Sequence, residues 1–243
     1  CLQEDRSMKE ETKKTLAQVS TATLTLQLLK RGIRNTYMRG VAPVGPMVER
    51  LVGEAVTLRF IPMREDLSTP EILADHNNPQ RVAIDTIPAG AILVIDARGV
   101  ADCASLGDIL AERIKQRGGA GVVTDGGVRD AAAVVETGLP VSAICPAAPA
   151  SLAAHTPIDR DLPIGCGGVA VIPGDVLVGD GDGVVVIPKD IVDEFARDAF
   201  GQEETEAFIK REVENGRSTI GLYPPDDGIR AEYAKWVEAG RPD

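Results

Sequence analysis

The sequence predicts an α/β protein built on a mixed or parallel sheet, and three observations support this. Short aliphatic runs at residues 91–96, 121–124 and 141–145 alternate with amphipathic stretches of helical length, which is the pattern of strands joined by crossover helices. Only 3% of the residues are aromatic, so the core has to be built from Val, Ile, Leu and Ala. From residue 164 onwards, short β runs separated by Gly-Asp turns predict an antiparallel meander.

The first half of the chain opens with helical sequence at residues 9–30, interrupted near Ser20-Thr21. Thr21 is expected to cap the second of these helices, because its hydroxyl can accept a hydrogen bond from the first turn. Residues 64–80 form a polar loop long enough to act as a lid or a subunit contact. The other elements expected here are a strand at 51–62, a short helix at 82–86, a strand at 91–96 and a loop at 97–106.

The second half begins with an amphipathic helix from Ile109 that Gly118-Gly119 ends. A strand at 121–124 follows, and Asp125-Gly126-Gly127 interrupts the chain before the next helix. The elements expected after this are a helix to residue 137, a strand at 141–145, a loop at 146–162, β runs at 169–172, 176–178 and 184–187, and a helix from 188 to about 215.

We expect residues 1–243 to form a single domain, with residues 1–20 as an N-terminal helical extension and residues 222–243 as a C-terminal tail. Tyr223, Tyr233 and Trp236 gather in this tail, although aromatic residues are rare elsewhere. The tail is therefore expected to dock on another surface, such as a second protomer.

Composition narrows the function. The net charge is −11 and the sequence contains no basic stretch, so nucleic-acid binding is not expected. No apolar run is long enough to span a membrane, and no signal peptide is visible. Four cysteines (Cys1, Cys103, Cys145 and Cys166) show no CxxC spacing, which favours reduced thiols in a cytoplasmic protein. Residues before Met8 are expected to come from an added segment or an upstream start, and they are left out of the functional argument.

Polar groups that can bind an anion stand at the starts of two successive helices. Gly107-Asp108 stands just before one helix, and Val128-Arg129-Asp130 is expected to begin the next. Helix N-termini offer free N–H groups to a carboxylate or phosphate. Arg129 adds a planar cation that can hold a carboxylate bidentately. Asp108, Asp125 and Asp130 add hard oxygen ligands or groups for proton transfer. The alternative for each of these residues is a purely structural role as a helix cap, part of a turn or a solvated ion pair.

Three other polar features have simpler interpretations. His76 and His155 each lie in an expected loop, and a surface position is the favoured interpretation for both. The run 179–183, Gly-Asp-Gly-Asp-Gly, resembles part of a calcium loop, but the Glu that completes an EF-hand is absent. A tight turn is therefore expected there.

The spacing Asp108, twenty intervening residues, Arg129-Asp130, together with the runs GDIL, DGGVRD and VAVIPGDVLVGDGDGVVVIP, resembles the HMG/CHA aldolase family. Its members are 4-hydroxy-4-methyl-2-oxoglutarate aldolases, which also decarboxylate oxaloacetate, and it includes the regulators of ribonuclease E activity. The resemblance extends roughly from residue 20 to residue 220. It implies an α-β-β-α sandwich of the swivelling phosphohistidine-domain type, assembled as a homotrimer or homohexamer with sites between subunits.

The same resemblance implies a role for each site residue. Asp130 would hold Mg²⁺ or Mn²⁺, and Arg129 would contact the keto and carboxylate oxygens of the substrate. Asp108 would position a water that moves the proton. The backbone that would bind the pyruvate carboxylate belongs to Gly107, Asp108, Ile109 and Leu110.

An acidic residue of the neighbouring subunit is also implied near the metal, and Glu203 and Glu204 are the candidates. Since Asp108, Arg129 and Asp130 are all present, the expected function is a metal-dependent class II aldolase that cleaves 4-hydroxy-2-oxo acids to pyruvate. The alternatives are a non-catalytic regulator of a ribonuclease and a sugar-acid lyase or dehydratase with the same scaffold. The expected partner is a small 2-oxo acid, with no nucleic acid and no membrane.

Overall fold

The computed structural model describes residues 7–47 and 49–241. Cys1 and the rest of the segment before Met8, except Ser7, lie outside the described residues. It confirms the α/β class, and none of the helices described is long and apolar enough to cross a membrane. The α-helices are α1 (Glu10–Leu16), α2 (Thr21–Lys30), α3 (Pro79–Thr86), α4 (Asp108–Gln116), α5 (Ala131–Thr137), α6 (Val192–Glu214) and α7 (Asp227–Glu238). Short 3-10 helices are η1 (Pro70–Ala74), η2 (Ser151–Ala153) and η3 (Lys189–Ile191).

The main sheet is mixed, as the sequence predicts. Its strand order is β1-β7-β5-β3-β2-β12-β13, and β9 also pairs with β2. The neighbours β2, β3, β5 and β7 are parallel, whereas β1, β9, β12 and β13 pair antiparallel. Its strands are β1 (Ala42–Pro43), β2 (Leu51–Pro62), β3 (Ile92–Asp96), β5 (Gly121–Thr124), β7 (Val141–Ala143), β9 (His155–Arg160), β12 (Val176–Asp180) and β13 (Gly183–Ile187).

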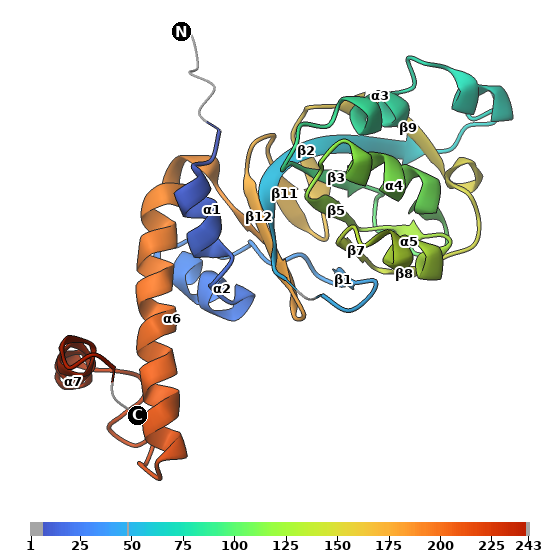
Figure 1. Cartoon of the computed structure of the whole chain (residues 1–243). Helices are drawn as coiled ribbons and strands as arrows, with labels where there is room; N and C mark the ends of the chain where they lie inside the picture. Colours follow the sequence, from blue (N-terminus) through green and yellow to red (C-terminus); the bar gives the residue numbers. More distant parts are fainter. Residues whose placement is uncertain (1–6, 48, 242–243) are drawn as a thin grey trace, which may run out of the picture.

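Strand β2 joins the parallel and antiparallel parts of the sheet. Along one side it pairs with β3, and on the other it pairs first with β12 and then, further along, with β9. Crossover helices α3, α4 and α5 connect the parallel strands, as expected (Figure 1). This arrangement places the loops that follow the parallel strands at one edge of the sheet, where α/β proteins bind ligands.

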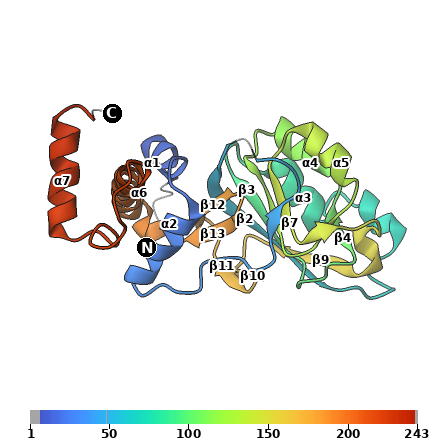
Figure 2. The ribbon, with the colours of Figure 1, turned by 90° about the horizontal axis from the view of Figure 1, so that it is seen from below.

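Three mainly aliphatic clusters form the core around the sheet, and a fourth lies where the C-terminal segment packs on α6. One lies between the parallel strands and the helices α3, α4 and α5, and includes Leu93, Ala111 and Ile114. A second lies under the two-stranded sheet β10 (Ile164–Cys166) and β11 (Val169–Val171). The third packs α1, α2 and α6 against β12 and β13, so these helices cover the opposite end of the sheet from α4 and α5 (Figure 2).

Two expected loops contain strands instead. A second parallel sheet forms from β4 (Ala104–Leu106), β6 (Gly127–Val128) and β8 (Cys145–Pro146). A loop was expected at β4, and a turn followed by the start of a helix at Val128 was expected at β6. The single strand expected at 141–145 is divided between β7 and β8. Strands of two or three residues carry too little alternation to be recognised. The expected loop 146–162 contains β9, whose Pro, Asp and Arg residues conceal a strand that is set by its pairing with β2.

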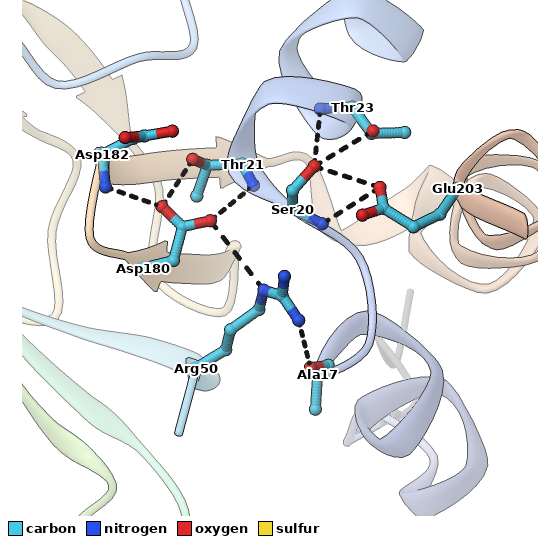
Figure 3. A network of polar contacts seen from close by, with 8 residues as sticks. All are labelled: Ala17, Ser20, Thr21, Thr23, Arg50, Asp180, Asp182 and Glu203. Atoms are coloured by element: carbon cyan, nitrogen blue, oxygen red, sulfur yellow. Dashed lines mark hydrogen bonds and ion pairs between the residues drawn. The ribbon is translucent and has the colours of Figure 1, made fainter. Parts of the chain in front are cut away.

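The start of α2 shows that the cap predicted at Thr21 is wrong, and the tight turn predicted at 179–183 is confirmed beside it (Figure 3). Ser20, not Thr21, is the N-cap, and its hydroxyl accepts from Thr23 N–H. Thr21 instead donates its N–H and its hydroxyl to the two carboxylate oxygens of Asp180, at 2.8 and 2.7 Å. Asp180 ends β12 at the tight turn predicted for 179–183, and the described residues contain no group of three side chains there suited to a metal.

The C-terminal tail docks on α6 of its own chain. Tyr233 and Trp236 of α7 pack against Phe208 of α6, with ring centroids 5.9 and 5.3 Å from that of Phe208. Figure 1 shows α7 beside the far half of α6, away from the sheet. Tyr233 and Trp236 thus have an intramolecular partner, whereas Tyr223 is 51% exposed.

Candidate functional site

The two polar segments singled out in the sequence follow neighbouring parallel strands. β4 ends at Leu106 and leads into Gly107, while β6 ends at Val128 and leads into Arg129. β4 and β6 pair in parallel, and the N–H of Arg129 donates to the carbonyl of Leu106 at 3.1 Å. Because the carboxyl ends of parallel strands lie at one edge, the two helix starts are brought side by side.

The start of α4 leaves its backbone donors available. Gly107 is the extended N-cap residue, and no side chain among the residues described caps this helix. Ile109 is 77% exposed, so its hydrophobic side chain points into solvent and contributes little to the core. The first N–H groups of a helix have no intrahelical partner and carry partial positive charge, so this turn can bind a carboxylate.

Arg129 and Asp130 form the second part of the site. Asp130 adopts the left-handed conformation (φ 53°, ψ 39°) as the residue before α5. Arg129 Nε donates to Asp130 Oδ2 at 2.8 Å, and the two side chains are 46% and 44% exposed. An ion pair so exposed contributes little stability and can exchange its partners for a ligand.

Gly107 is required where these two segments meet. A Cβ at this position would lie 2.9 Å from Cγ of Arg129 and 3.3 Å from Oδ2 of Asp130. Since real Cβ contacts are longer than the first of these distances, any other residue would displace Arg129. The absence of a side chain is what lets the guanidinium approach the N-terminus of α4.

One pocket of about 210 Å³ contains every site residue expected from this central stretch except Asp125. Its lining residues are Gln80, Arg81, Ala104, Ser105, Leu106, Gly107, Asp108, Ile109, Leu110, Arg129, Asp130, Ala150 and Ser151. Larger hollows of about 480 and 740 Å³ lie beside α5 and between α2 and α6, but neither is lined by both helix starts. We therefore take the smaller pocket as the candidate site.

Asp125 has a structural position instead. Its side chain is 7% exposed and accepts from the N–H of Ala97 at 2.7 Å and of Gly167 at 3.2 Å. Burial raises the pKa of this carboxyl group, and the two N–H donors oppose that effect. Asp125 thus ties the end of β3 to the β10–β11 turn and does not line the pocket.

Glu203 and Glu204 lie on α6, at the other end of the molecule from α4 (Figure 2). Glu203 Oε2 accepts from the hydroxyl of Ser20 at 3.0 Å (Figure 3). Glu204 accepts from the hydroxyl of Tyr233 at 3.3 Å. Within one protomer these carboxylates hold α2 and α7 to α6, and their expected approach to a neighbouring subunit's pocket stays a prediction.

His76 is exposed as expected, but the surface position expected for His155 is wrong. His155 is fully buried, its ring centroid lies 5.1 Å from that of Phe60, and its Nδ1 is 3.1 Å from a guanidinium nitrogen of Arg98. Burial and the nearby Arg98 charge lower its pKa to about 4. Arg98 also donates to the carbonyl of Ala154 at 2.7 Å, next to the pocket wall at Ser151.

Sequence reasoning missed four polar lining residues: Gln80, Arg81, Ser105 and Ser151. The helix containing Gln80 and Arg81 was expected to begin at residue 82, which placed both in the preceding loop. The Asn78-Pro79 pair is the signal that could have found the true start, since Asn caps helices and Pro favours their first position. Ser151 offered no such signal.

The fold and the pocket together define an α/β protein with a candidate site at the carboxyl ends of parallel strands. A sequence model of the RraA-like family (Aldolase/RraA) matches residues 16–186, which is more than half of the chain. The chain therefore belongs to the RraA-like family, in agreement with the resemblance carried by the motifs.

Three relatives illustrate the range of this family. Protein DlpA of Legionella pneumophila is 30% identical over 183 residues, covering 73% of this chain and 28% of DlpA. A protein of Halalkalibacterium halodurans named "Putative 4-hydroxy-4-methyl-2-oxoglutarate aldolase" is 34% identical over 135 residues, covering 55% of this chain and 63% of that protein. The chain thus spans less than two thirds of the length of either protein.

The third relative is a solved structure. Streptomyces coelicolor RraAS2, described as an unusual member of the RNase ES inhibitor RraA protein family, superimposes with a TM-score of 0.74 at 34% identity. The match covers 85% of this chain and 99% of RraAS2.

Proposed function

We propose that this protein is a divalent-metal-dependent class II aldolase that cleaves 4-hydroxy-2-oxo acids to pyruvate and also decarboxylates oxaloacetate. The observation that carries the proposal is the meeting of the α4 N-terminus with Arg129 and Asp130 in one pocket, across a glycine that leaves room for the arginine. Relatives named as aldolases support the same activity.

The donors of the pocket suit a hard cation. It offers the carboxylates of Asp108 and Asp130, and the described part of the chain holds no group of three His, Cys, Asp or Glu side chains that could bind a metal. Two carboxylates are fewer than the three or four side chains of a typical zinc site, but they fit Mg²⁺ or Mn²⁺, which keep several waters. Asp130 would hold the ion, which when bound supplies Lewis-acid stabilisation of charge developing on the 2-oxo oxygen.

The residues of the chain supply the rest of the chemistry. N–H groups of the first turn of α4, from Asp108 to Leu110, bind the substrate carboxylate and fix its orientation. Arg129 faces the oxygen on which negative charge grows as the C3–C4 bond breaks. Asp108 holds a water that takes the proton of the 4-hydroxyl group as that carbon becomes the carbonyl of the second product. The same water then returns the proton to C3, which gives pyruvate.

The assembly belongs to the same proposal. A homotrimer or homohexamer would let Glu203 or Glu204 of a neighbouring protomer approach the pocket, because α6 projects away from the sheet of its own chain (Figure 1). We also propose that the fold is the α-β-β-α sandwich of the swivelling phosphohistidine-domain type that the family resemblance implies.

The test is a rate measurement with two substrates. Purified protein is given oxaloacetate or 4-hydroxy-4-methyl-2-oxoglutarate with Mg²⁺, with Mn²⁺, or with a chelator, and pyruvate is followed through lactate dehydrogenase. We expect metal-dependent pyruvate formation from both substrates above the rate of free metal. Equal rates with and without folded protein would refute the aldolase proposal.

A second candidate function is regulation of a ribonuclease, and the match to nearly all of RraAS2 favours it. A pure regulator needs no metal and no Arg129 side chain. Absence of metal-dependent decarboxylation, combined with inhibition of an RNase E-type enzyme by the same folded sample, would establish this alternative.

A further inference from the structure

A second arginine lines the pocket in addition to Arg129. Arg81 lies in the first turn of α3, and its position is fixed by the residues beside it. Asn78 caps the helix by accepting from the N–H of Gln80 at 2.9 Å and of Arg81 at 3.4 Å. The buried Gln80 donates to the carbonyl of Ser105 at 2.6 Å, which ties the start of α3 to β4.

The guanidinium of Arg81 has no hydrogen-bond or ion-pair partner among residues 7–47 and 49–241. The nearest acidic side chain along the same helix face, Asp85, accepts instead from Nε of Arg113 at 2.6 Å. Arg129 is likewise engaged with Asp130. Arg81 is therefore the pocket arginine whose guanidinium has no partner within the described residues, whereas Arg129 has to exchange Asp130 for a ligand.

The charges of the pocket explain what such a ligand would be. Its charged side chains are Arg81, Asp108, Arg129 and Asp130, which sum to zero. With a divalent cation at Asp130, as the proposed function requires, the part of the pocket that one protomer forms carries two positive charges. A dicarboxylate balances that charge, whereas a monocarboxylate leaves one positive charge unmatched.

We propose that Arg81 is a specificity-determining residue that binds the second carboxylate of the substrate, so that the protein selects 2-oxo dicarboxylates over 2-oxo monocarboxylates. This inference rests on the proposed function for the position of the first carboxylate at the start of α4. The planar guanidinium can hold the distal carboxylate through two parallel hydrogen bonds.

Binding of two unreactive ligands tests the inference. 2-Oxoglutarate and 2-oxopentanoate have the same five-carbon backbone, differ by one carboxylate, and lack the 4-hydroxyl group needed for cleavage. Their dissociation constants are measured by calorimetry with Mg²⁺ for the wild type, Arg81→Met, Arg81→Lys and a control, Arg117→Met, which removes an exposed arginine at the far end of α4.

We expect Arg81→Met to weaken 2-oxoglutarate binding by about 10- to 100-fold, the usual effect of losing a charge-assisted hydrogen bond, and to leave 2-oxopentanoate binding unchanged. The affinity of Arg81→Lys for 2-oxoglutarate should lie between those of the wild type and Arg81→Met. Arg117→Met should bind both ligands as the wild type does. An unchanged ratio of the two constants in Arg81→Met would overturn this inference and leave the aldolase proposal standing. Failure of the wild type to bind either ligand would overturn both.

Discussion

Arg129 and Asp130 are consecutive residues whose side chains pair, with Nε of Arg129 lying 2.8 Å from Oδ2 of Asp130. The pair stands at the end of β6, where Asp130 turns into the left-handed conformation before α5 begins. A carboxylate held by one oxygen keeps the other for a cation, and the pairing keeps the guanidinium beside it. Substitutions of Asp130, Arg129 and Gly107 therefore each disturb this arrangement in a different way.

Asp130→Asn should abolish metal-dependent turnover, because the amide removes the charge that holds a divalent cation. Asn tolerates the left-handed conformation, so the free energy of unfolding should change by less than about 0.5 kcal/mol. Initial rates with Mg²⁺ measure the loss of turnover, and urea denaturation measures the free energy of unfolding. A variant that keeps the wild-type rate would place the metal elsewhere.

Arg129→Lys should lower kcat for oxaloacetate decarboxylation by roughly 10²- to 10³-fold, with a smaller change in KM. Lysine keeps the charge but lacks the planar fork that can contact two oxygens at once. Steady-state kinetics at saturating metal measure the effect. If kcat stays within a factor of two of wild type, Arg129 does not face the developing charge.

Gly107→Ala should lower kcat/KM with little loss of stability. The new methyl group would lie 2.9 Å from Cγ of Arg129, and the exposed arginine would move away from the α4 N-terminus to relieve the contact. Gly201→Ala on α6 is the matched control, since a Cβ there meets nothing within 4 Å. The control should retain full activity and gain about 0.5–1 kcal/mol of stability from the better helix former. Equal activity of both variants would contradict the prediction.

Asp180→Ala should destabilise the protein by about 1–2 kcal/mol without changing activity. It removes both acceptors of Thr21 at the start of α2, and it removes the carboxylate 3.8 Å from Nε of Arg50 (Figure 3). Asp182→Ala, an exposed change in the same turn, should shift stability by less than about 0.5 kcal/mol. Urea denaturation of the two variants measures the difference, and equal midpoints would mean that Asp180 does not anchor α2.

His155 should make the protein less stable as the pH falls. Its pKa in the folded protein is about 4 against an ordinary 6.5, so between these values the unfolded chain binds the proton and the folded chain does not. The free energy of unfolding contributed by this group should fall by roughly 1.5 kcal/mol from pH 6.5 to pH 5. His155→Gln should remove that part of the pH dependence. Parallel curves for wild type and variant would show that His155 is not buried in neutral form.

The sequence by itself determined the elements whose signals are local. The strand at 51–62, the helix after Gly107 and the tight turn at 179–183 all form where predicted, because capping residues, glycines and periodicity act within a few residues of chain. The same local signals placed Gly107-Asp108 and Arg129-Asp130 at helix starts. Their resemblance to a known family was enough to name the residues of the pocket's centre.

Only the tertiary structure decided what depends on contacts between distant segments. The pairing of β4 with β6 brings the two helix starts together, the packing of β9 on β2 buries His155, and the Gln80 contact with Ser105 places Arg81 in the pocket. The tertiary structure also places Glu203 where it accepts a hydrogen bond from Ser20 of the same chain. A strand of two residues or a polar side chain in a loop carries no information about its partner, because the energy that fixes it comes from surface buried between parts of the chain far apart in sequence.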